Sequence, residues 1–159
     1  MARTQCGKNL CAGHQVIAAG VMCDNAFEAR SRGLLGDEDV ILFSQAQLLP
    51  AAVEELCSQM ESWKGRPAEG LIPAVEAEVR EAMDQWIADQ VEAGSFTDHD
   101  AFLGRVLTGV LCGDPEGETA RRNEDVLALE RQAFIRLYES ERTKLRIDHM
   151  LKTGKRLKN

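Results

Sequence analysis

The stretch that decides the fold is Glu124–Tyr138 (EDVLALERQAFIRLY), which runs after two residues into Glu141–Asn159 (ERTKLRIDHMLKTGKRLKN). Apolar residues recur every three to four positions in both parts, which is the period of an amphipathic α-helix. Ser140 separates the two parts, and Gly154 is well placed for the left-handed residue that ends many helices. The stretch therefore predicts two consecutive helices joined by a short connection.

The helical period also recurs upstream of this stretch. Thr97 with Asp100 three residues later resembles a capping box, which marks the start of a helix. Only Val40–Phe43 resembles a strand, and Gly65–Gly70 (GRPAEG) is predicted to be a linker. We predict a mainly α fold, with five or six helices in a bundle-like arrangement and at most one short strand. The further predicted helices are Ala26–Arg32, one between Ser44 and Gly65, one ending at Gly94, and one from Thr97 to Gly113.

Length and composition predict the domain organisation. Residues 1–15 show neither period, and Gly7, Asn9 and Gly13 are poor helix formers, so we expect a flexible arm there. Residues 16–159 are expected to form a single helical domain, because 159 residues is an ordinary length for one domain. The apolar runs are shorter than the ~20 residues needed to span a bilayer. We therefore expect a cytoplasmic protein that does not bind membranes.

The charge of the chain is unevenly distributed. The net charge is −7, but after Glu141 seven Lys and Arg residues accompany only Asp148, so this tail carries +6 and the remainder carries −13. An acidic chain of this kind is not expected to bind nucleic acid. The basic tail instead predicts a local anion site or pairing with acidic groups. Cationic residues in a last helical turn also complement the helix dipole without any ligand.

The last third of the chain also resembles a known family. Leu127–Asn159 is similar to the closing segment of the large 3-hydroxyacyl-CoA dehydrogenase/enoyl-CoA hydratase proteins of fatty-acid β-oxidation. In that segment a Leu-Glu-Arg-x-Ala-Phe helix precedes a His-Met-Leu-x-x-Gly-Lys-x-Leu-x-Asn end. Glu92–Gly113 resembles the helix and turn of the same tail, and Ala26–Leu42 resembles the region after a crotonase-type core. The resemblance covers about residues 20–159, whereas Met1–Gln15 departs from it.

The resemblance implies a detached C-terminal piece without the family's catalytic parts. Those parts are a glycine-rich fold that binds NAD and a crotonase core that holds the acyl-CoA oxyanion, and the sequence contains no GxGxxG. Asp98 and Asp100 are interpreted as charges at a helix start, and His99 and His149 as structural or surface residues. We therefore predict no catalytic residues, no cofactor and no enzymatic activity. An autonomous enoyl-CoA hydratase or 3-hydroxyacyl-CoA dehydrogenase is the least favoured alternative.

The five cysteines are odd in number and form no CxxC pair, which favours reduced thiols. Cys57 and Cys112 lie within helical apolar patterns and are expected to be small buried side chains. Four residues near the N-terminus are of types that bind zinc, but their spacing does not form two tight pairs, so no metal site is predicted. These four are Cys6, Cys11, His14 and Cys23.

Two functions remain under consideration. The first is a non-catalytic structural or interaction module that forms a homodimer, because a helix separated from its original partner exposes an apolar face. The interface is expected on the helices Phe102–Leu111 and Val126–Tyr138. The alternative is an accessory subunit that binds acyl-CoA or a crotonase-type partner enzyme. In that case the basic tail contacts the phosphates of CoA through Arg146, Lys152, Lys155 and Lys158.

Overall fold

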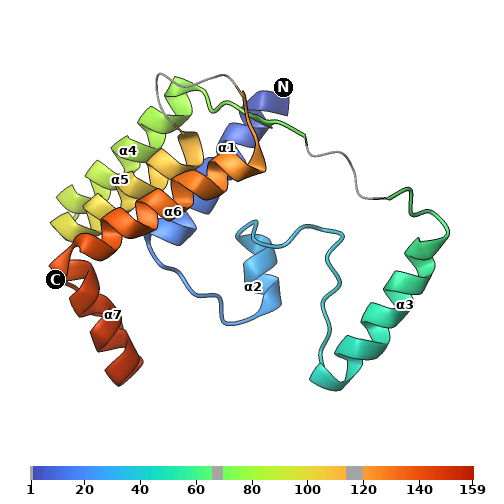
Figure 1. The fold of residues 1–159 in the computed structure, drawn as a ribbon. Helices are drawn as coiled ribbons and strands as arrows, with labels where there is room; N and C mark the ends of the chain where they lie inside the picture. Colours follow the sequence, from blue (N-terminus) through green and yellow to red (C-terminus); the bar gives the residue numbers. More distant parts are fainter. Residues whose placement is uncertain (1, 66–69, 114–119) are drawn as a thin grey trace. The chain divides into compact units, whose positions relative to one another are not determined.

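The computed structural model describes residues 2–65, 70–113 and 120–159, with side chains from residue 7 onward (Figure 1). These ranges contain seven α-helices, one short 3₁₀ helix and a two-stranded antiparallel sheet, which confirms the mainly α fold. No helix in them is long and apolar enough to cross a bilayer. The chain divides into two compact units. The core unit is Met1–Met22 with Leu71–Asn159, and the α3 unit is Cys23–Gly70.

Five helices build the core unit. Helix α5 is central, because it packs against α1, α4 and α6, while α7 follows α6 after Ser140 (Figure 1). Two short strands, β1 (Ile72–Pro73) and β2 (Ala120–Arg121), pair antiparallel in this unit. The helices are α1 (Ala2–Ala18), α4 (Ala77–Glu92), α5 (Asp98–Cys112), α6 (Asn123–Glu139) and α7 (Glu141–Thr153).

The core depends on a close approach between α4 and α5. Met83 and Ile87 of α4 are almost completely buried. They face a side of α5 that carries small residues, among them Ala101 and Gly104. A Cβ atom at Gly104 would lie 2.9 Å from Cδ1 of Ile87, closer than real Cβ atoms come to a neighbour. Glycine at this position therefore lets a branched core side chain pack directly against the backbone of α5.

Local interactions define both ends of α5. The Thr97 side chain accepts a hydrogen bond from the Asp100 backbone N–H, and the Asp100 carboxylate accepts one from the Thr97 backbone N–H. This confirms the predicted capping box. At the other end, Gly113 has a φ of 75°, which a glycine adopts without steric cost. The Arg121 guanidinium donates hydrogen bonds to the carbonyls of Val110 and Leu111, which lack helical partners.

Helix α1 differs from the sequence prediction. Residues 2–18 form one helix, although Gly7, Asn9 and Gly13 are poor helix formers, and the flexibility expected of residues 1–15 stays a prediction. The glycines that weaken this helix also permit its packing, because a Cβ atom at Gly7 would lie 2.9 Å from Cγ2 of Val79 in α4. His14 is completely buried in the same unit. Tertiary contacts with α4 and α5 thus outweigh low intrinsic helix propensity.

The α3 unit is built differently. Asn25 caps α2 (Ala26–Ser31) by accepting a hydrogen bond from the Glu28 backbone N–H. Ser44 caps the 3₁₀ helix η1 (Gln45–Gln47), which leads into α3 (Leu48–Met60). No described residue of this unit is buried. The apolar side chains of α3 and its C-terminal flank are exposed instead, namely Leu48, Leu49, Val53, Leu56, Met60 and Trp63.

One further expectation needs correction here. Val40–Phe43 is not a strand, because no other segment pairs with it, and the two strands lie at β1 and β2 instead. The chain divides into two compact units, and the apolar pattern of α3 contributes no buried residue among those described, while the single domain expected over residues 16–159 stays a prediction. The predicted linker Gly65–Gly70 lies largely outside the described residues, which omit 66–69.

Candidate functional site

Arg146, one of the four predicted phosphate-binding residues, is a structural residue of the core unit. Its guanidinium lies 2.6 Å from the Asp100 carboxylate and also donates hydrogen bonds to the Thr97 hydroxyl and to Asn159. The Arg146 side chain is only 15% exposed. This network joins α7 and the end of the chain to the first turn of α5. A ligand phosphate would have to displace those partners.

The same network affects the ionisation of Asp100. Burial alone opposes the charged form, but hydrogen bonds from the Thr97 backbone and from Arg146 outweigh it and hold the pKa of Asp100 below its ordinary value. Asp100 therefore stays ionised, and its carboxylate oxygens accept hydrogen bonds from Thr97 and Arg146. The capping-box carboxylate is an anchor for Arg146 rather than an acid or base available to a substrate.

The three predicted lysines have different surroundings. Lys152 forms an exposed ion pair with Asp148, one helical turn away, at 2.7 Å. Lys158 donates a hydrogen bond to the Ser95 carbonyl at 3.5 Å. Lys155 is exposed beyond the end of α7. The structure thus brings Arg146 and Lys158 close to the N-terminal side of α5. A CoA phosphate site on this tail stays a prediction.

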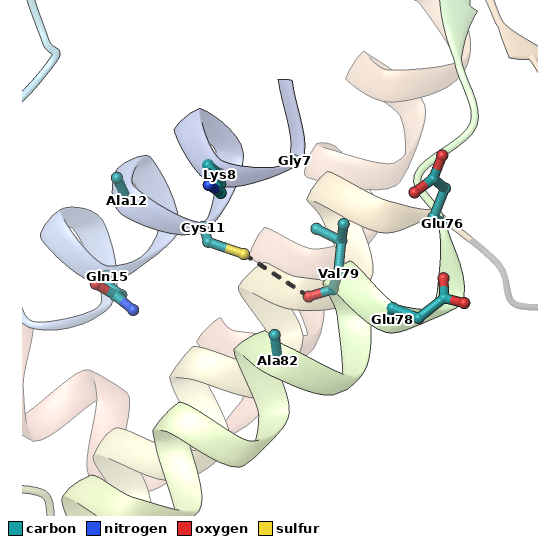
Figure 2. A pocket seen from close by; sticks show the side chains of 9 residues that line it. All are labelled: Gly7, Lys8, Cys11, Ala12, Gln15, Glu76, Glu78, Val79 and Ala82. Atoms are coloured by element: carbon teal, nitrogen blue, oxygen red, sulfur yellow. Dashed lines mark hydrogen bonds between the residues drawn. The ribbon is translucent and has the colours of Figure 1, made fainter. Parts of the chain in front are cut away.

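A cavity of about 400 Å³ lies between α1 and the beginning of α4 (Figure 2). Cys11 points into it, with its Sγ atom 3.9 Å from the Val79 carbonyl. Burial raises the pKa of the Cys11 thiol, so it stays protonated at neutral pH. Lys8, Glu76 and Glu78 lie at the rim (Figure 2). Because its described contact is with a backbone carbonyl and its thiol is protonated, Cys11 lacks the activation that a nucleophilic cysteine requires.

The possible metal ligands do not form a cluster among the described residues. Cys11 and His14 lie on α1 in the core unit, whereas Cys23 begins the α3 unit. The Cys6 side chain lies outside the described part of the chain. Among the side chains that the structure describes, no group of three His, Cys, Asp or Glu residues is arranged to hold a metal ion. The four described cysteines, Cys11, Cys23, Cys57 and Cys112, are free thiols.

Two histidines are buried in the core unit, which sequence reasoning did not predict for His14. The His14 Nε2 atom lies 3.1 Å from the Thr108 hydroxyl and 3.4 Å from the Gly104 carbonyl, and its ring packs edge-on against Trp86. Burial lowers the pKa of His14. Since this side chain has no exposed surface, it is not placed to act on a substrate.

His99 is buried as well, and its environment is mostly cationic. Its Nε2 atom lies 3.1 Å from the Thr143 hydroxyl of α7, and its ring stacks on Phe102. Burial, followed by the positive charges of Arg146 and Arg142, lowers the pKa of His99. His99 therefore links α5 to α7 in its neutral form, which is the structural role expected for it.

The two predicted interface helices are exposed to different degrees. Helix α5 contacts three other helices of the core unit, and most residues of Phe102–Leu111 are only partly exposed. Helix α6 packs against α5 with one side and presents large apolar side chains on another. We call this exposed set the α6 face, and its members are between 52% and 63% exposed: Leu127, Phe134, Ile135 and Tyr138. Phe134 and Tyr138 stack on each other with ring centroids 6.2 Å apart.

The fold and its surfaces define a helical protein with two buried histidines and an exposed apolar face, without a recognised catalytic cluster among the described residues. The chain is 30% identical over 148 residues to a probable 3-hydroxyacyl-CoA dehydrogenase of Bacillus subtilis (strain 168). The match covers 91% of this chain but 18% of that protein. No family model matches the chain, and no solved structure matches it.

The match supports the dehydrogenase part of the predicted resemblance, and the crotonase part stays a prediction. The chain spans less than a fifth of the length of this relative. The activity in the relative's name therefore belongs to a protein of which the larger part has no counterpart in this chain of 159 residues.

Proposed function

We propose that the chain is a non-catalytic helical interaction module related to a fragment of a 3-hydroxyacyl-CoA dehydrogenase, and that it associates with itself through the α6 face. The observation that carries this proposal is the exposure of four large apolar side chains on one side of α6, namely Leu127, Phe134, Ile135 and Tyr138. A fragment match of 18% of the relative's length supports a derived piece rather than a complete enzyme.

The size of the α6 face agrees with a modest interface. Four large side chains that are each about half exposed present on the order of 300 Å² of apolar surface, which is the size of patch that commonly marks an interaction site. Helix α7 exposes further apolar side chains, including Leu145 and Leu151. The ~600 Å² that each partner contributes at the low end of specific interfaces would require further residues besides the α6 face.

The test is the mass of the intact chain, measured by light scattering after size exclusion over a range of concentrations. We expect a dimer that Phe134→Glu converts to a monomer, because the charge would be buried without a partner in the interface. Phe134 is 63% exposed, so the fold should survive, and circular dichroism checks this. Leu56→Glu in α3 is the matched control and should leave the dimer intact.

Two results would overturn this interface. One is a monomer at high concentration in the unchanged chain. The other is a dimer that Leu56→Glu dissociates and Phe134→Glu does not, which would place the contact on the α3 unit. The absence of activity is tested separately, by the absorbance of crotonyl-CoA and by NAD reduction with a 3-hydroxyacyl-CoA. Turnover in either assay would reject the non-catalytic assignment.

The CoA-binding alternative rests on the tail cations, of which Lys155 and Lys158 are exposed. Calorimetry with crotonyl-CoA tests it directly. Binding that Lys155→Glu and Lys158→Glu together remove would favour an accessory subunit that binds acyl-CoA. A crotonase-type partner enzyme is the remaining form of this alternative, and it would show as a complex larger than the homodimer in a mixture of the two proteins.

A further inference from the structure

A second cavity, of about 350 Å³, lies along the line where α5 and α6 meet. Its apolar lining includes Val106 and Val110 from α5 and Leu129 and Ala133 from α6. Gly109 also lines it, and a Cβ atom built at Gly109 would have no atom within 4 Å. The cavity is therefore a groove with an apolar floor, left open partly because position 109 has no side chain. We call it the α5–α6 groove.

Arginines from three different helices line the groove: Arg80 of α4, Arg105 of α5 and Arg136 of α6. Among the residues that the structure describes, no carboxylate lines it. Arg80 already donates a hydrogen bond to the Gly113 carbonyl. Arg105 makes no hydrogen bond or ion pair with any described residue. The groove thus has an excess of positive charge that the described side chains around it do not neutralise.

Helix directions decide where these charges lie. Arg136 sits over the Phe102 ring, 5.6 Å from its centroid, so the end of α6 lies beside the beginning of α5. Arg121, just before α6, contacts carbonyls at the end of α5. The two helices are therefore antiparallel, and Arg105 and Arg136 share one end of the groove. Gly113 and Arg80 lie at the other end. Eight helical residues separate Arg105 from Gly113, which corresponds to about 12 Å along the helix axis.

We propose that the α5–α6 groove binds a single-chain amphiphile with an anionic head group, a carboxylate or a phosphate. The head group lies between Arg105 and Arg136, because a guanidinium offers paired N–H donors that match the oxygens of either anion. The apolar chain lies over Val106, Gly109 and Ala133 toward Gly113. An inorganic anion alone would leave the apolar floor uncovered, and a neutral chain would leave the arginines without a partner.

This site is independent of the proposed self-association. The groove uses the side of α6 that contains Leu129, Ala133 and Arg136, whereas the α6 face contains Phe134 and Tyr138 on another side. It also differs from the predicted phosphate site on the tail, since none of the four tail residues lines it. Ligand binding and dimerisation therefore succeed or fail separately.

The experiment is calorimetric titration of the full chain with decanoate and with decyl phosphate, both below their micelle-forming concentrations. Decanol, which has the apolar chain without a charge, and inorganic phosphate, which has the charge without a chain, serve as control ligands. Arg105→Gln with Arg136→Gln removes the charges of the head-group end and should weaken binding about tenfold or more. Gly109→Leu fills the floor while keeping every charge, and leucine favours the helix more than glycine does. Arg131→Gln, on α6 but outside the groove lining, is the matched charge control.

The proposal expects saturable one-site binding of at least one anionic amphiphile, lost in both groove variants and retained in Arg131→Gln. Preference for decanoate assigns a carboxylate head group, and preference for decyl phosphate assigns a phosphate. Three results would overturn the proposal: no saturable binding of either compound, equal binding of decanol, or binding that both groove variants retain. Circular dichroism of each variant confirms that a loss of binding is not a loss of fold.

Discussion

Cys112 and Cys57 illustrate how differently the two units use the same sequence pattern. Both cysteines lie on helical apolar stripes, and both were expected to be buried. Cys112 is 8% exposed and lies against Met83, whereas Cys57 is exposed on α3. Helix α5 has three neighbouring helices, and α3 contacts chiefly its own leading turn. An amphipathic pattern therefore predicts that a helix has an apolar face, but not that the chain supplies the surface to cover it.

The largest expected contrast between the units is in side-chain truncation. Ile87→Ala should lower the free energy of unfolding of the core unit by about 2–5 kcal/mol, because it opens a cavity at a completely buried position. Leu56→Ala in α3 should change it by less than about 0.5 kcal/mol, because that side chain is 63% exposed. Urea unfolding followed by tryptophan fluorescence measures both, because Trp86 lies in the core unit and Trp63 in the α3 unit. Equal losses would mean that α3 is covered in solution.

A second contrast compares two ion pairs that both involve α7. Arg146→Ala should cost about 3 kcal/mol, because it leaves the Asp100 carboxylate, whose side chain is 9% exposed, without its charged partner. Lys152→Ala breaks an exposed pair with Asp148 and should cost at most about 0.5 kcal/mol. Thermal unfolding of the two variants ranks them. If the costs were similar, the network around Arg146 would not anchor the tail.

The pH dependence of stability should also arise mainly in the core unit. Because the pKa values of His14 and His99 are lowered in the fold from 6.5, the folded state favours their neutral forms. Their contribution is present above about pH 6.5 and is lost as the pH falls below it, since the unfolded chain then binds more protons. Replacing His14 with Gln should flatten this decline in urea midpoints between pH 7 and 5. An unchanged slope would contradict the role of His14.

Asp100 adds a separate step at lower pH. Its pKa is lowered in the fold from 3.8, so its contribution is present above that value and is lost as the pH falls through the lowered value. In the Arg146→Ala variant this acid step should shrink, whereas the step from the histidines should remain. A scan of thermal midpoints from pH 7 to 2 separates the two steps.

The smallest expected contrast concerns helix caps. Thr97→Ala should destabilise the core unit by about 1 kcal/mol or somewhat more, because Thr97 caps α5 and also accepts a hydrogen bond from Arg146. Asn25→Ala removes the cap of α2 in the α3 unit, where no described residue is buried, and should leave cooperative unfolding unchanged. A measurable loss from Asn25→Ala would show that the two units unfold together.

Much of the helical framework was predictable because its signals are local. The Thr97–Asp100 capping box and the left-handed Gly154 each depend on residues within one helical turn, and the structure confirms both. The surface role of the tail charges was less predictable. Arg146 lies among the lysines and arginines of a basic tail, which predicts a solvated side chain. Its main partner is nevertheless Asp100, 46 residues earlier in the chain.

Helix α1 could not be predicted for a related reason. Glycines normally indicate low helix propensity. The sequence of residues 1–15 contains no signal for the packing of Gly7 against Val79 in α4. The α5–α6 groove likewise combines Arg80, Arg105 and Arg136, which belong to three separate helices. A sequence signal for it would have required knowing that α5 and α6 are antiparallel neighbours.

The sequence by itself determined the helical class, most helix boundaries and the unequal distribution of charge. Periodicity and capping depend on residues a few positions apart, and composition does not depend on the position of residues at all. Tertiary structure alone decided which apolar faces are covered, which histidines are buried and which arginines are paired. Those outcomes depend on partners far away in the chain, and burial and ionisation energies depend on the partner as much as on the residue itself. The exposed stripe of α3 and the buried stripe of α5 differ for that reason.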